Sequence, residues 1–313
     1  MSIDASPLLI VGTGAMACLF AGRLSAAGIP FTMLGSWPEG VAALQQDGVR
    51  VLEQDGTKKA FPVQVITDPA SCRGAQFALV LVKSWQTGQA ATQLTRCLDS
   101  QGLALTLQNG MGNREVLASS LGSQRVALGV TTAGAYLVGP GQVCPAGEGV
   151  ITLGIHSRLK PLANILRRAN FIVETVPSTN ELLWGKLVIN ASINPLTALL
   201  RVPNGELLAR PSARALLAQV AREAAAVAVA KGIQLPYPDP VVAVEAIASH
   251  TAQNYSSMLQ DVLRGAPTEV DAISGAIVQA SEQTGVPAPI NRSLWQLVRA
   301  LVPPNNRELE DDL

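Results

Sequence analysis

The segment PLLIVGTGAMACLFAGRLSAAG, residues 7–28, is the part of the sequence most indicative of the fold class. Its first five residues form a short apolar run, which is typical of a buried strand. Residues Met16–Ala27 have the pattern of a helix, and Gly28 is a typical helix stop. The motif G-x-G-x-x-[GA] therefore lies between a strand and a helix, which is its position in dinucleotide-binding folds.

The loop GTGAMA (12–17) has the residues that a pyrophosphate site needs. Gly12 permits a tight turn, Gly14 lets a phosphate approach the backbone, and Ala17 is small enough for close helix–strand contact. The helix N-terminus adds free N–H groups and the positive end of its dipole. A tight turn without a ligand is the alternative. We expect the cofactor on Gly12, Thr13, Gly14, Ala15, Met16 and Ala17.

The first half of the chain alternates strand-like and helix-like stretches, which predicts an α/β fold with a Rossmann-type, doubly wound, mostly parallel sheet. A helix is predicted at Gly88–Cys97, a hairpin at 49–65 with its turn at Asp55-Gly56, and an antiparallel extension at 136–154. Buried strands are predicted at 7–11, 31–34, 77–82, 103–107 and 126–130.

Strand patterns vanish from about residue 178, and the rest of the chain is predicted to be all-α. Most of these helices begin near Pro or end at Gly, which is the expected asymmetry. We expect two domains, 1–176 and 177–313, with a cleft between them. The predicted helices are Glu181–Leu200, Pro211–Lys231, Pro238–Gln253, Ser256–Arg264, Pro267–Thr284 and Arg292–Leu301.

Composition narrows the class of function. The 313 residues have zero net charge, so neither nucleic acid nor an anionic membrane is an expected partner. Apolar runs are too short for a transmembrane helix, and the first residues do not resemble a signal peptide. We expect a cytoplasmic monomer or homodimer that acts on a small molecule. Four scattered cysteines predict buried free thiols, and two isolated histidines predict no metal site.

The most unusual segment is LWGKLVINASINP, residues 183–195. Apolar residues run almost all the way round this predicted helix, which indicates burial. Lys186, Asn190 and Asn194 nevertheless recur every four residues and share one face. Burying them is costly unless something pairs with them. Because Pro195 disfavours helical geometry at the preceding residue, Asn194 is predicted at a kink or helix end.

Other polar residues stand where strands end. Lys83 follows the third buried strand and Asn109 the next, and ligands of open α/β sheets lie beyond such ends. Ordinary loop positions are the alternative. After the second strand, MLGSWPEG (33–40) offers Ser36 where an acidic residue would indicate NAD and an Arg NADP, so this position leaves the cofactor open.

The segment 254–269 holds Asn254, Ser257 and Glu269. Asn and Ser are common helix caps, and a Glu in a first helical turn suits the helix dipole. Capping is therefore the alternative to a binding role for these three residues.

Taken together, these motifs resemble the ketopantoate reductase family over residues 8 to about 285. The family is a Rossmann domain followed by a helical domain, and it reduces ketopantoate to pantoate with NADPH, toward pantothenate and coenzyme A. The motifs that carry the resemblance are GTGAMA (12–17), VKSWQT (82–87), LQNGMGN (107–113), LWGKLVINASINPLTALL (183–200), PNGEL (203–207), NYSSMLQD (254–261) and RGAPTE (264–269).

The resemblance implies roles for these positions. Lys186 matches the general acid, which donates a proton to the carbonyl oxygen. Asn190 matches a substrate-side polar position, and one turn along the helix from Lys186 it can fix the lysine or the substrate, so we expect both residues to be catalytic. Substrate-side positions are Asn194, Asn204, Asn254 and Ser257. Positions that contact the cofactor or line its cleft are Lys83, Asn109, Ala135 and Glu269.

Two positions depart from the family pattern. Ser36 stands where many members carry an Arg for the 2′-phosphate, so NADP is expected and NAD is the alternative. Ala133 stands where some members carry His. Functional alternatives are a reductase of another branched 2-oxo acid, a 3-hydroxy-acid dehydrogenase, and a non-catalytic dinucleotide sensor. The Lys186, Asn190 and Asn194 face argues against a sensor, which needs only the glycine loop.

Overall fold

A computed structural model describes residues 7–53 and 55–301, which divide into two units. The segment Asn109–Gly112 groups with the helical half of the chain, although its neighbours in sequence belong to the other unit. The first unit comprises the described residues up to Gln108 and Asn113–Thr179, and the second comprises Asn109–Gly112 and the described residues from Asn180 onward.

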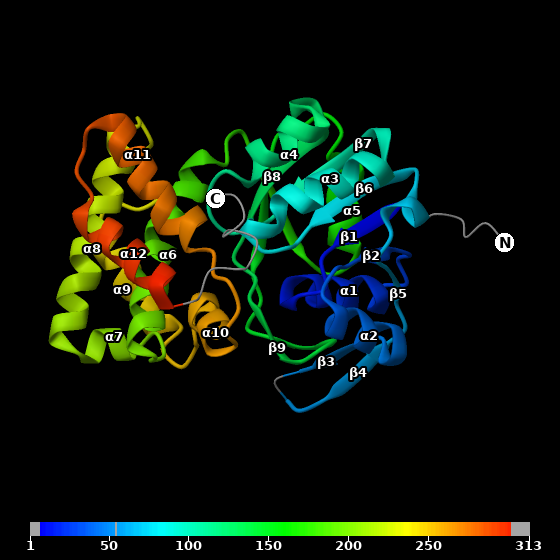
Figure 1. Cartoon of the computed structure of the whole chain (residues 1–313), viewed down its shortest axis with the longest axis horizontal. Coiled ribbons are helices and arrows are strands. Elements are labelled where there is room, and N and C mark those ends of the chain that lie inside the picture. The colour runs from blue at the N-terminus through cyan, green and yellow to red at the C-terminus, as the bar shows by residue number, and fades with distance from the viewer. Residues whose placement is uncertain (1–6, 54, 302–313) are drawn as a thin grey trace, which may run out of the picture. The chain divides into compact units, whose positions relative to one another are not determined.

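Eight of the described strands form the large sheet of the first unit (Figure 1). They are β1 (Leu8–Val11), β2 (Thr32–Leu34), β5 (Gln64–Ile66), β6 (Ala75–Val80), β7 (Leu98–Thr106), β8 (Val126–Thr131), β11 (Val150–Gly154) and β12 (Ile172–Val176). Their order is β12-β11-β8-β7-β6-β1-β2-β5, and all neighbours run parallel except β8 and β11. The predicted doubly wound, mostly parallel sheet is confirmed.

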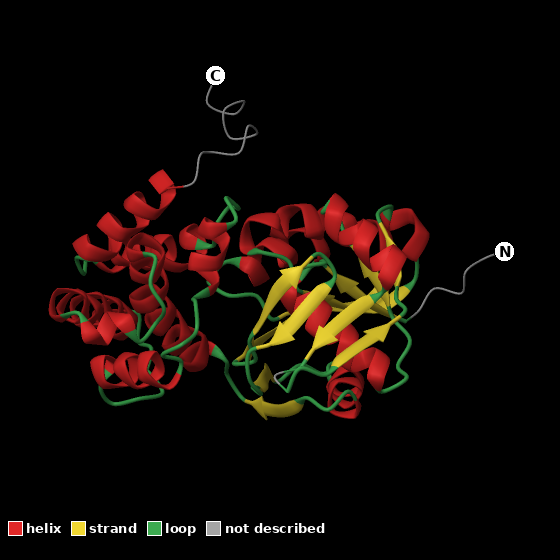
Figure 2. Cartoon of the chain, turned by 90° about the horizontal axis from the view of Figure 1, so that it is seen from below, coloured by secondary structure: helices red, strands yellow, loops and turns green. Residues whose placement is uncertain are grey.

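Side chains alternate along each strand, so the sheet has two faces. Helices lie on both sides of it (Figure 2). Leu8 and Ile10 pack on one face against α1 (Ala15–Ala26), α2 (Pro38–Asp47) and α5 (Lys160–Arg168). Leu9 and Val11 pack on the other face against α3 (Thr87–Cys97) and α4 (Asn113–Leu121). Burial on both sides explains why the strands are continuous apolar runs.

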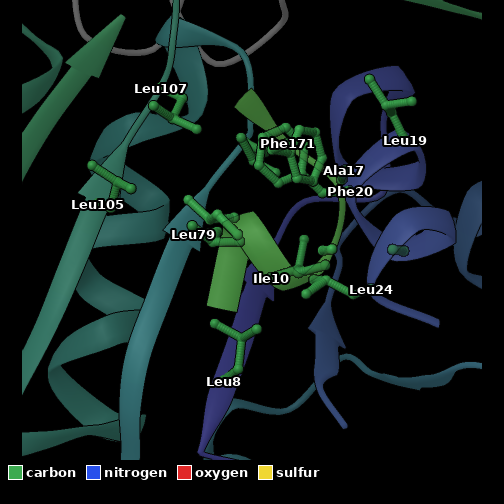
Figure 3. Packing of buried hydrophobic residues seen from close by; sticks show 14 of the residues in the cluster. Leu8, Ile10, Ala17, Leu19, Phe20, Leu24, Leu79, Leu105, Leu107 and Phe171 are labelled. Carbon is green, nitrogen blue, oxygen red and sulfur yellow. The ribbon is translucent and has the colours of Figure 1, made fainter. Parts of the chain in front are cut away.

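Figure 3 shows the packing on the first of these faces. Ile10, Leu79 and Leu105 are in register across β1, β6 and β7, and so form one apolar row. The rings of Phe20 and Phe171 stack with their centroids 4.3 Å apart. The helix that follows the glycine loop is therefore fixed to the sheet by its own core residues.

A smaller sheet contains β3 (Val49–Leu52), β4 (Lys58–Phe61), β9 (Ala135–Gly139) and β10 (Gln142–Pro145). Strands β3 and β4 form the predicted antiparallel hairpin, with Gly56 at φ +87° in its turn. The prediction is wrong beyond Phe61, because Gln64–Ile66 belongs to the large sheet as β5. Pro62 has no N–H to donate, which ends the hairpin ladder.

The predicted antiparallel extension at 136–154 is divided between the two sheets. Strand β11 extends the large sheet antiparallel to β8, as expected. Strands β9 and β10 pair with each other and join β3 instead. Helix α1 packs against this smaller sheet, and a Cβ on Gly22 would lie 2.6 Å from Val51 Cγ2, so glycine permits the close approach.

Helices are the only regular secondary structure in the described part of the second unit from Asn180 onward (Figure 2). Its core packs α6 against the alanine-rich α8, where Ala221, Ala224 and Ala228 are fully buried. The helices are α6 (Asn180–Leu200), α7 (Glu206–Ala209), α8 (Pro211–Ala230), α9 (Pro240–His250), α10 (Ser257–Leu263), the π-helix η4 (Asp271–Gly275), α11 (Ala276–Thr284) and α12 (Pro289–Leu301).

The helix predicted at Pro267–Thr284 begins later than expected. Its first turn starts at Val270, whose N–H donates to Thr268 Oγ1 (3.4 Å), and the turn η4 is a π-helix. The Ala272 carbonyl in this turn accepts the Met111 N–H (2.8 Å), a bond from outside the helix. Glu269 therefore lies just before the helix rather than inside it.

The described helices contain no segment long and apolar enough to cross a bilayer. All four cysteines are buried free thiols, as predicted.

Candidate functional site

The glycine loop after β1 has the open backbone that a phosphate requires. Gly12 has φ +126°, which L side chains rarely adopt, and its N–H donates to the Leu34 carbonyl (2.8 Å). Gly14 has an ordinary φ of −81°, and a Cβ there would meet no heavy atom within 4 Å. Gly12 is thus required by the fold, whereas Gly14 leaves room for a ligand.

The start of α1, directly after Gly14, offers backbone N–H groups. The first N–H groups of α1, at Ala15, Met16 and Ala17, have no acceptor within the helix. Thr13 and Ala17 are buried in the protein, and a Cβ on Gly35 would lie 2.4 Å from Thr13 Cγ2. The loop therefore fits the pyrophosphate of a dinucleotide, held by N–H groups and the helix dipole.

Lys83 and Ser36 lie at the same edge of the sheet as this loop. The strand order reverses about β1 and β6, and the Leu81 N–H donates to the Val11 carbonyl (2.9 Å). Lys83 follows β6, and its N–H donates to Gln86 Oε1 (3.3 Å) in the turn η2 (Ser84–Gln86). Ser36 is exposed beyond β2. Dinucleotides of doubly wound folds bind at this edge.

Ala135 and Ala133 follow β8. Ala135 begins β9, opposite Pro145, and is half-buried. The Ala133 N–H donates to Thr131 Oγ1 (3.1 Å). A Cβ on Gly149 would lie 2.1 Å from the Ala133 nitrogen, so the two backbones touch at this point.

Helix α6 carries the polar face that its sequence predicts. Lys186 and Asn190 are half-buried and Asn194 is buried. No side-chain hydrogen bond links Asn190 or Asn194 to any other described residue. Buried amides are normally paired, so this face has the chemistry of a binding surface for a polar ligand.

The prediction of a helix end at Asn194 is wrong, because α6 continues through Pro195 to Leu200. Pro195 cannot donate to the Ala191 carbonyl. The next turn is reinforced by Thr197 Oγ1, which donates to the Ile193 (3.1 Å) and Asn194 (2.9 Å) carbonyls. Tertiary packing of this buried segment outweighs the local preference of the proline.

Lys186 is electrostatically linked to Glu269 within the second unit. Burial lowers the pKa of Lys186 from 10.5 to about 8, and the Glu269 carboxylate opposes that shift. The Glu269 side chain is only 5% exposed, and its Oε2 accepts a bond from Asn109 Nδ2 (3.4 Å). Lys186, Glu269 and Asn109 thus belong to one polar group, although they lie far apart in sequence.

The turn Asn109–Gly112 packs directly on η4. Gly110 has φ +80°, and a Cβ there would lie 2.6 Å from the Ala272 carbonyl oxygen. Together with the Met111–Ala272 bond, this contact explains why the segment groups with the helical unit.

Asn204 forms hydrogen bonds with the turn that contains Asn254. Its Nδ2 donates to Thr251 Oγ1 (2.8 Å), and its backbone N–H donates to the Asn254 carbonyl (3.0 Å). Asn204 is buried, whereas the Asn254 side chain is exposed. The structure therefore gives Asn204 a supporting role and leaves the Asn254 amide available.

The helix cap of α10 is Ser256, whose Oγ accepts the Leu259 N–H (3.1 Å) and bonds with Thr197 Oγ1 (2.7 Å). Ser257 is half-buried, and its hydroxyl has no hydrogen-bond partner in the described part of the chain. Capping by the neighbouring serine leaves the Ser257 hydroxyl available to a ligand.

The candidate residues thus fall into two groups. Those of the glycine loop, Ser36, Lys83 and Ala135 belong to the first unit, and the remaining candidates belong to the second. Sequence reasoning missed a buried polar network next to Asn109, formed by Thr87, Thr106, Gln108 and Asn113. The polar residues on either side of Asn109 in LQNGMGN were its only signal.

Among the described residues, no three His, Cys, Asp or Glu side chains form a group that would hold a metal ion.

Comparison with known proteins gives matches along nearly the whole chain. The family described as "Ketopantoate reductase PanE/ApbA" matches residues 8–158, and its "C terminal" family matches residues 179–302. The 2-dehydropantoate 2-reductase of Halobacterium salinarum is 34% identical over 297 residues, which cover 93% of this chain and 97% of that protein.

Solved structures agree with the fold. The PanE/ApbA family ketopantoate reductase from Ralstonia eutropha JMP134 has a TM-score of 0.87 and 34% identity, and the match covers 94% of this chain and 98% of that one. D-mandelate dehydrogenase, solved with NADH and anilino(oxo)acetate, has a TM-score of 0.87 at 24% identity, over 94% of this chain and 97% of that one. At that identity the likeness concerns the fold alone.

Proposed function

This chain belongs to the ketopantoate reductase family, and we propose that it reduces 2-dehydropantoate to pantoate with NADPH, toward pantothenate and coenzyme A. The observation that carries the proposal is the face of α6: a lysine of lowered pKa, with two amides that have no partner among the described side chains. A 2-oxo acid brings the carbonyl and carboxylate oxygens that such a face can bind.

Lys186 is the proposed general acid. The carbonyl oxygen gains negative charge as the carbonyl carbon is reduced, and an ammonium group stabilises that charge and then donates its proton. A pKa of about 8 leaves the amine mostly protonated at neutral pH, yet able to release the proton. Burial lowers the pKa of Lys186, and the Glu269 carboxylate opposes this by favouring the charged form of the lysine.

Asn190 and Asn194 are proposed to orient the substrate on the same face of α6. An amide can bind a carboxylate or hydroxyl without adding charge, so it does not disturb the acidity of Lys186. The Ser257 hydroxyl and the Asn254 amide are proposed to bind the carboxylate and hydroxyl ends. Asn204 is proposed to act by holding the Asn254 turn, as its two bonds to residues 251 and 254 suggest.

The dinucleotide supplies the hydride, and the first unit is proposed to bind it. The N–H groups of Gly14, Ala15 and Met16 would hold the pyrophosphate, with Lys83 at the neighbouring strand end. We propose NADPH over NADH, because the end of β2 offers Ser36 and no carboxylate at the position that would repel a 2′-phosphate.

A direct assay tests this function. Purified full-length protein is mixed with 2-dehydropantoate and either NADPH or NADH, and nicotinamide absorbance is followed. We expect turnover with both cofactors, faster with NADPH. Turnover only with other 2-oxo acids would overturn the substrate, and tight dinucleotide binding without any turnover would overturn the reaction.

A further inference from the structure

Four buried side chains of the first unit form a hydrogen-bonded group that the proposed chemistry does not use. Thr87, Thr106, Gln108 and Asn113 are each at most 8% exposed. The Thr87 hydroxyl is central, since it accepts a bond from Gln108 Nε2 (2.8 Å) and donates to Asn113 Oδ1 (2.8 Å). Because these side chains are buried, water cannot replace the hydrogen bonds between them.

Gln108 is fixed on its other sides as well. Its Nε2 also donates to the Val82 carbonyl (3.0 Å), and its Oε1 accepts from the Thr106 hydroxyl (2.9 Å). Val82 follows β6 and directly precedes Lys83. The hydrogen-bonded group therefore connects the segment after β6 to the end of β7.

Gln108 and Asn113 are the two residues that flank Asn109–Gly112. One hydroxyl, that of Thr87, therefore binds both ends of this four-residue turn. Two of its four residues, Gly110 and Gly112, have φ values of +80° and +88°, and glycine has little conformational restraint of its own. Its path depends on how its ends are held.

The contacts of this turn reach the proposed acid. Asn109 Nδ2 donates to Glu269 Oε2 (3.4 Å), and the Met111 N–H donates to the Ala272 carbonyl (2.8 Å). Glu269 is the carboxylate that acts electrostatically on Lys186. A change in the path of the turn would move the Asn109 amide away from Glu269.

We propose that Thr87 is a positioning residue whose buried hydroxyl clamps Asn109–Gly112 and so holds the Asn109 amide at the Glu269 carboxylate. Its effect on catalysis rests on the proposed function, whereas the clamp itself does not. Thr87 acts through Asn109, and its hydroxyl accepts a hydrogen bond from Gln108 and donates one to Asn113.

Amide hydrogen exchange tests the clamp without any activity measurement. Thr87→Val keeps the shape of the side chain but leaves Gln108 Nε2 and Asn113 Oδ1 without their shared partner. We expect peptides spanning 109–112 to exchange roughly tenfold faster, because local opening becomes easier. Thr87→Ser retains the hydroxyl and should exchange like the wild type.

Leu94→Val is the matched control, because Leu94 is a buried apolar residue of the same helix α3. It removes a methylene group but no hydrogen bond, and exchange at 109–112 should stay at the wild-type rate. Unchanged exchange in Thr87→Val, or equal acceleration in Leu94→Val, would overturn the clamp.

Kinetics with NADPH and 2-dehydropantoate test the link to Asn109. We expect kcat of Thr87→Val to fall about tenfold and Thr87→Ser to restore it. In an Asn109→Ala background, Thr87→Val should cause no further loss, since coupled residues are not additive. Equal losses in both backgrounds would overturn the positioning role.

The two proposals fail in distinguishable ways. A wild-type protein without turnover would contradict the proposed function, and the exchange measurement would still decide whether Thr87 clamps the turn. A wild-type protein that turns over, with faster exchange but unchanged kcat in Thr87→Val, would overturn the positioning role alone.

Discussion

The glycine loop and helix α6 are built on opposite principles. The loop presents backbone N–H groups, and its only conformational demand is the φ of +126° at Gly12. Helix α6 instead presents three specific side chains, Lys186, Asn190 and Asn194. A site made of backbone tolerates substitutions that keep the path of the chain, whereas a site made of side chains depends on each one.

The two regions also differ in how they affect the stability of the folded protein. The loop uses N–H groups that any helix N-terminus leaves without partners. Helix α6 instead holds a lysine whose charged form is disfavoured by burial, which destabilises the folded protein at neutral pH. Substitutions in each of the two regions can test this difference.

The largest expected effect is on catalysis at α6. Lys186→Met should lower kcat for 2-dehydropantoate reduction by on the order of 10²–10⁴-fold, because it removes the proposed proton donor. Lys231→Met is a matched control, since Lys231 is an exposed lysine of the same unit whose side-chain ammonium bonds only to Gln283 Oε1 (3.0 Å) among the described residues. Steady-state absorbance assays measure both, and a kcat within threefold of wild type for Lys186→Met would remove its role as acid.

The same substitution should stabilise the fold. The pKa of Lys186 falls from 10.5 in the unfolded chain to about 8 in the folded protein, which corresponds to roughly 3 kcal/mol of destabilisation at pH 7. Between pH 8 and 10.5 the unfolded chain binds the extra proton, so wild-type stability rises with pH relative to Lys186→Met.

Urea unfolding of both proteins from pH 7 to 10 measures this difference. Lys186→Met should be more stable at pH 7, and its advantage should shrink above pH 8. A constant difference across this range would show that the pKa of Lys186 is not lowered.

Substitutions in the glycine loop should distinguish the glycine that the fold requires from the one that cofactor binding requires. Gly14→Ala should leave the melting temperature unchanged, because its Cβ meets no atom within 4 Å, and weaken NADPH binding by about tenfold. Gly12→Ala should destabilise the protein by about 1 kcal/mol or more, because its φ is +126° and its Cβ would lie 3.1 Å from the Leu81 carbonyl oxygen. Thermal unfolding and fluorescence titration with NADPH distinguish the two. Equal melting temperatures for the two variants would contradict this assignment.

The smallest expected effect concerns Ser36. Ser36→Arg adds a cation that can pair with a 2′-phosphate at the end of β2, so the ratio of kcat/KM for NADPH over NADH should rise several-fold. Ser36→Ala controls for loss of the hydroxyl. No change in the ratio would place the ribose phosphate elsewhere.

Sequence patterns predicted the parts of the site that are local. The strand, glycine loop and helix at 7–28 are contiguous, and the polar face of α6 follows from its period of four residues. The proximity of Glu269 to Lys186 could not be predicted, because it depends on how η4 packs. The Thr87 network likewise joins the starts and ends of three elements, and hydrogen bonds between separate segments leave no periodic signal.

The wrong predictions at Pro195 and Pro267 have a shared cause. Pro195 lies inside α6 and Pro267 precedes its helix by three residues, so neither proline marks a boundary as local rules expect. In both places contacts from elsewhere in the chain determine the outcome: burial around α6, and the Met111 bond to the Ala272 carbonyl at η4.

The most direct test of the account is the pH dependence of kcat/KM for 2-dehydropantoate reduction. The wild type should be constant below about pH 8 and fall tenfold per pH unit above it, as Lys186 loses its proton. Glu269→Gln should move this break to lower pH, because the carboxylate that raises the pKa of Lys186 is gone. A profile without a break near pH 8, or a break that Glu269→Gln leaves in place, would contradict the claim that Lys186 is the acid tuned by burial and Glu269.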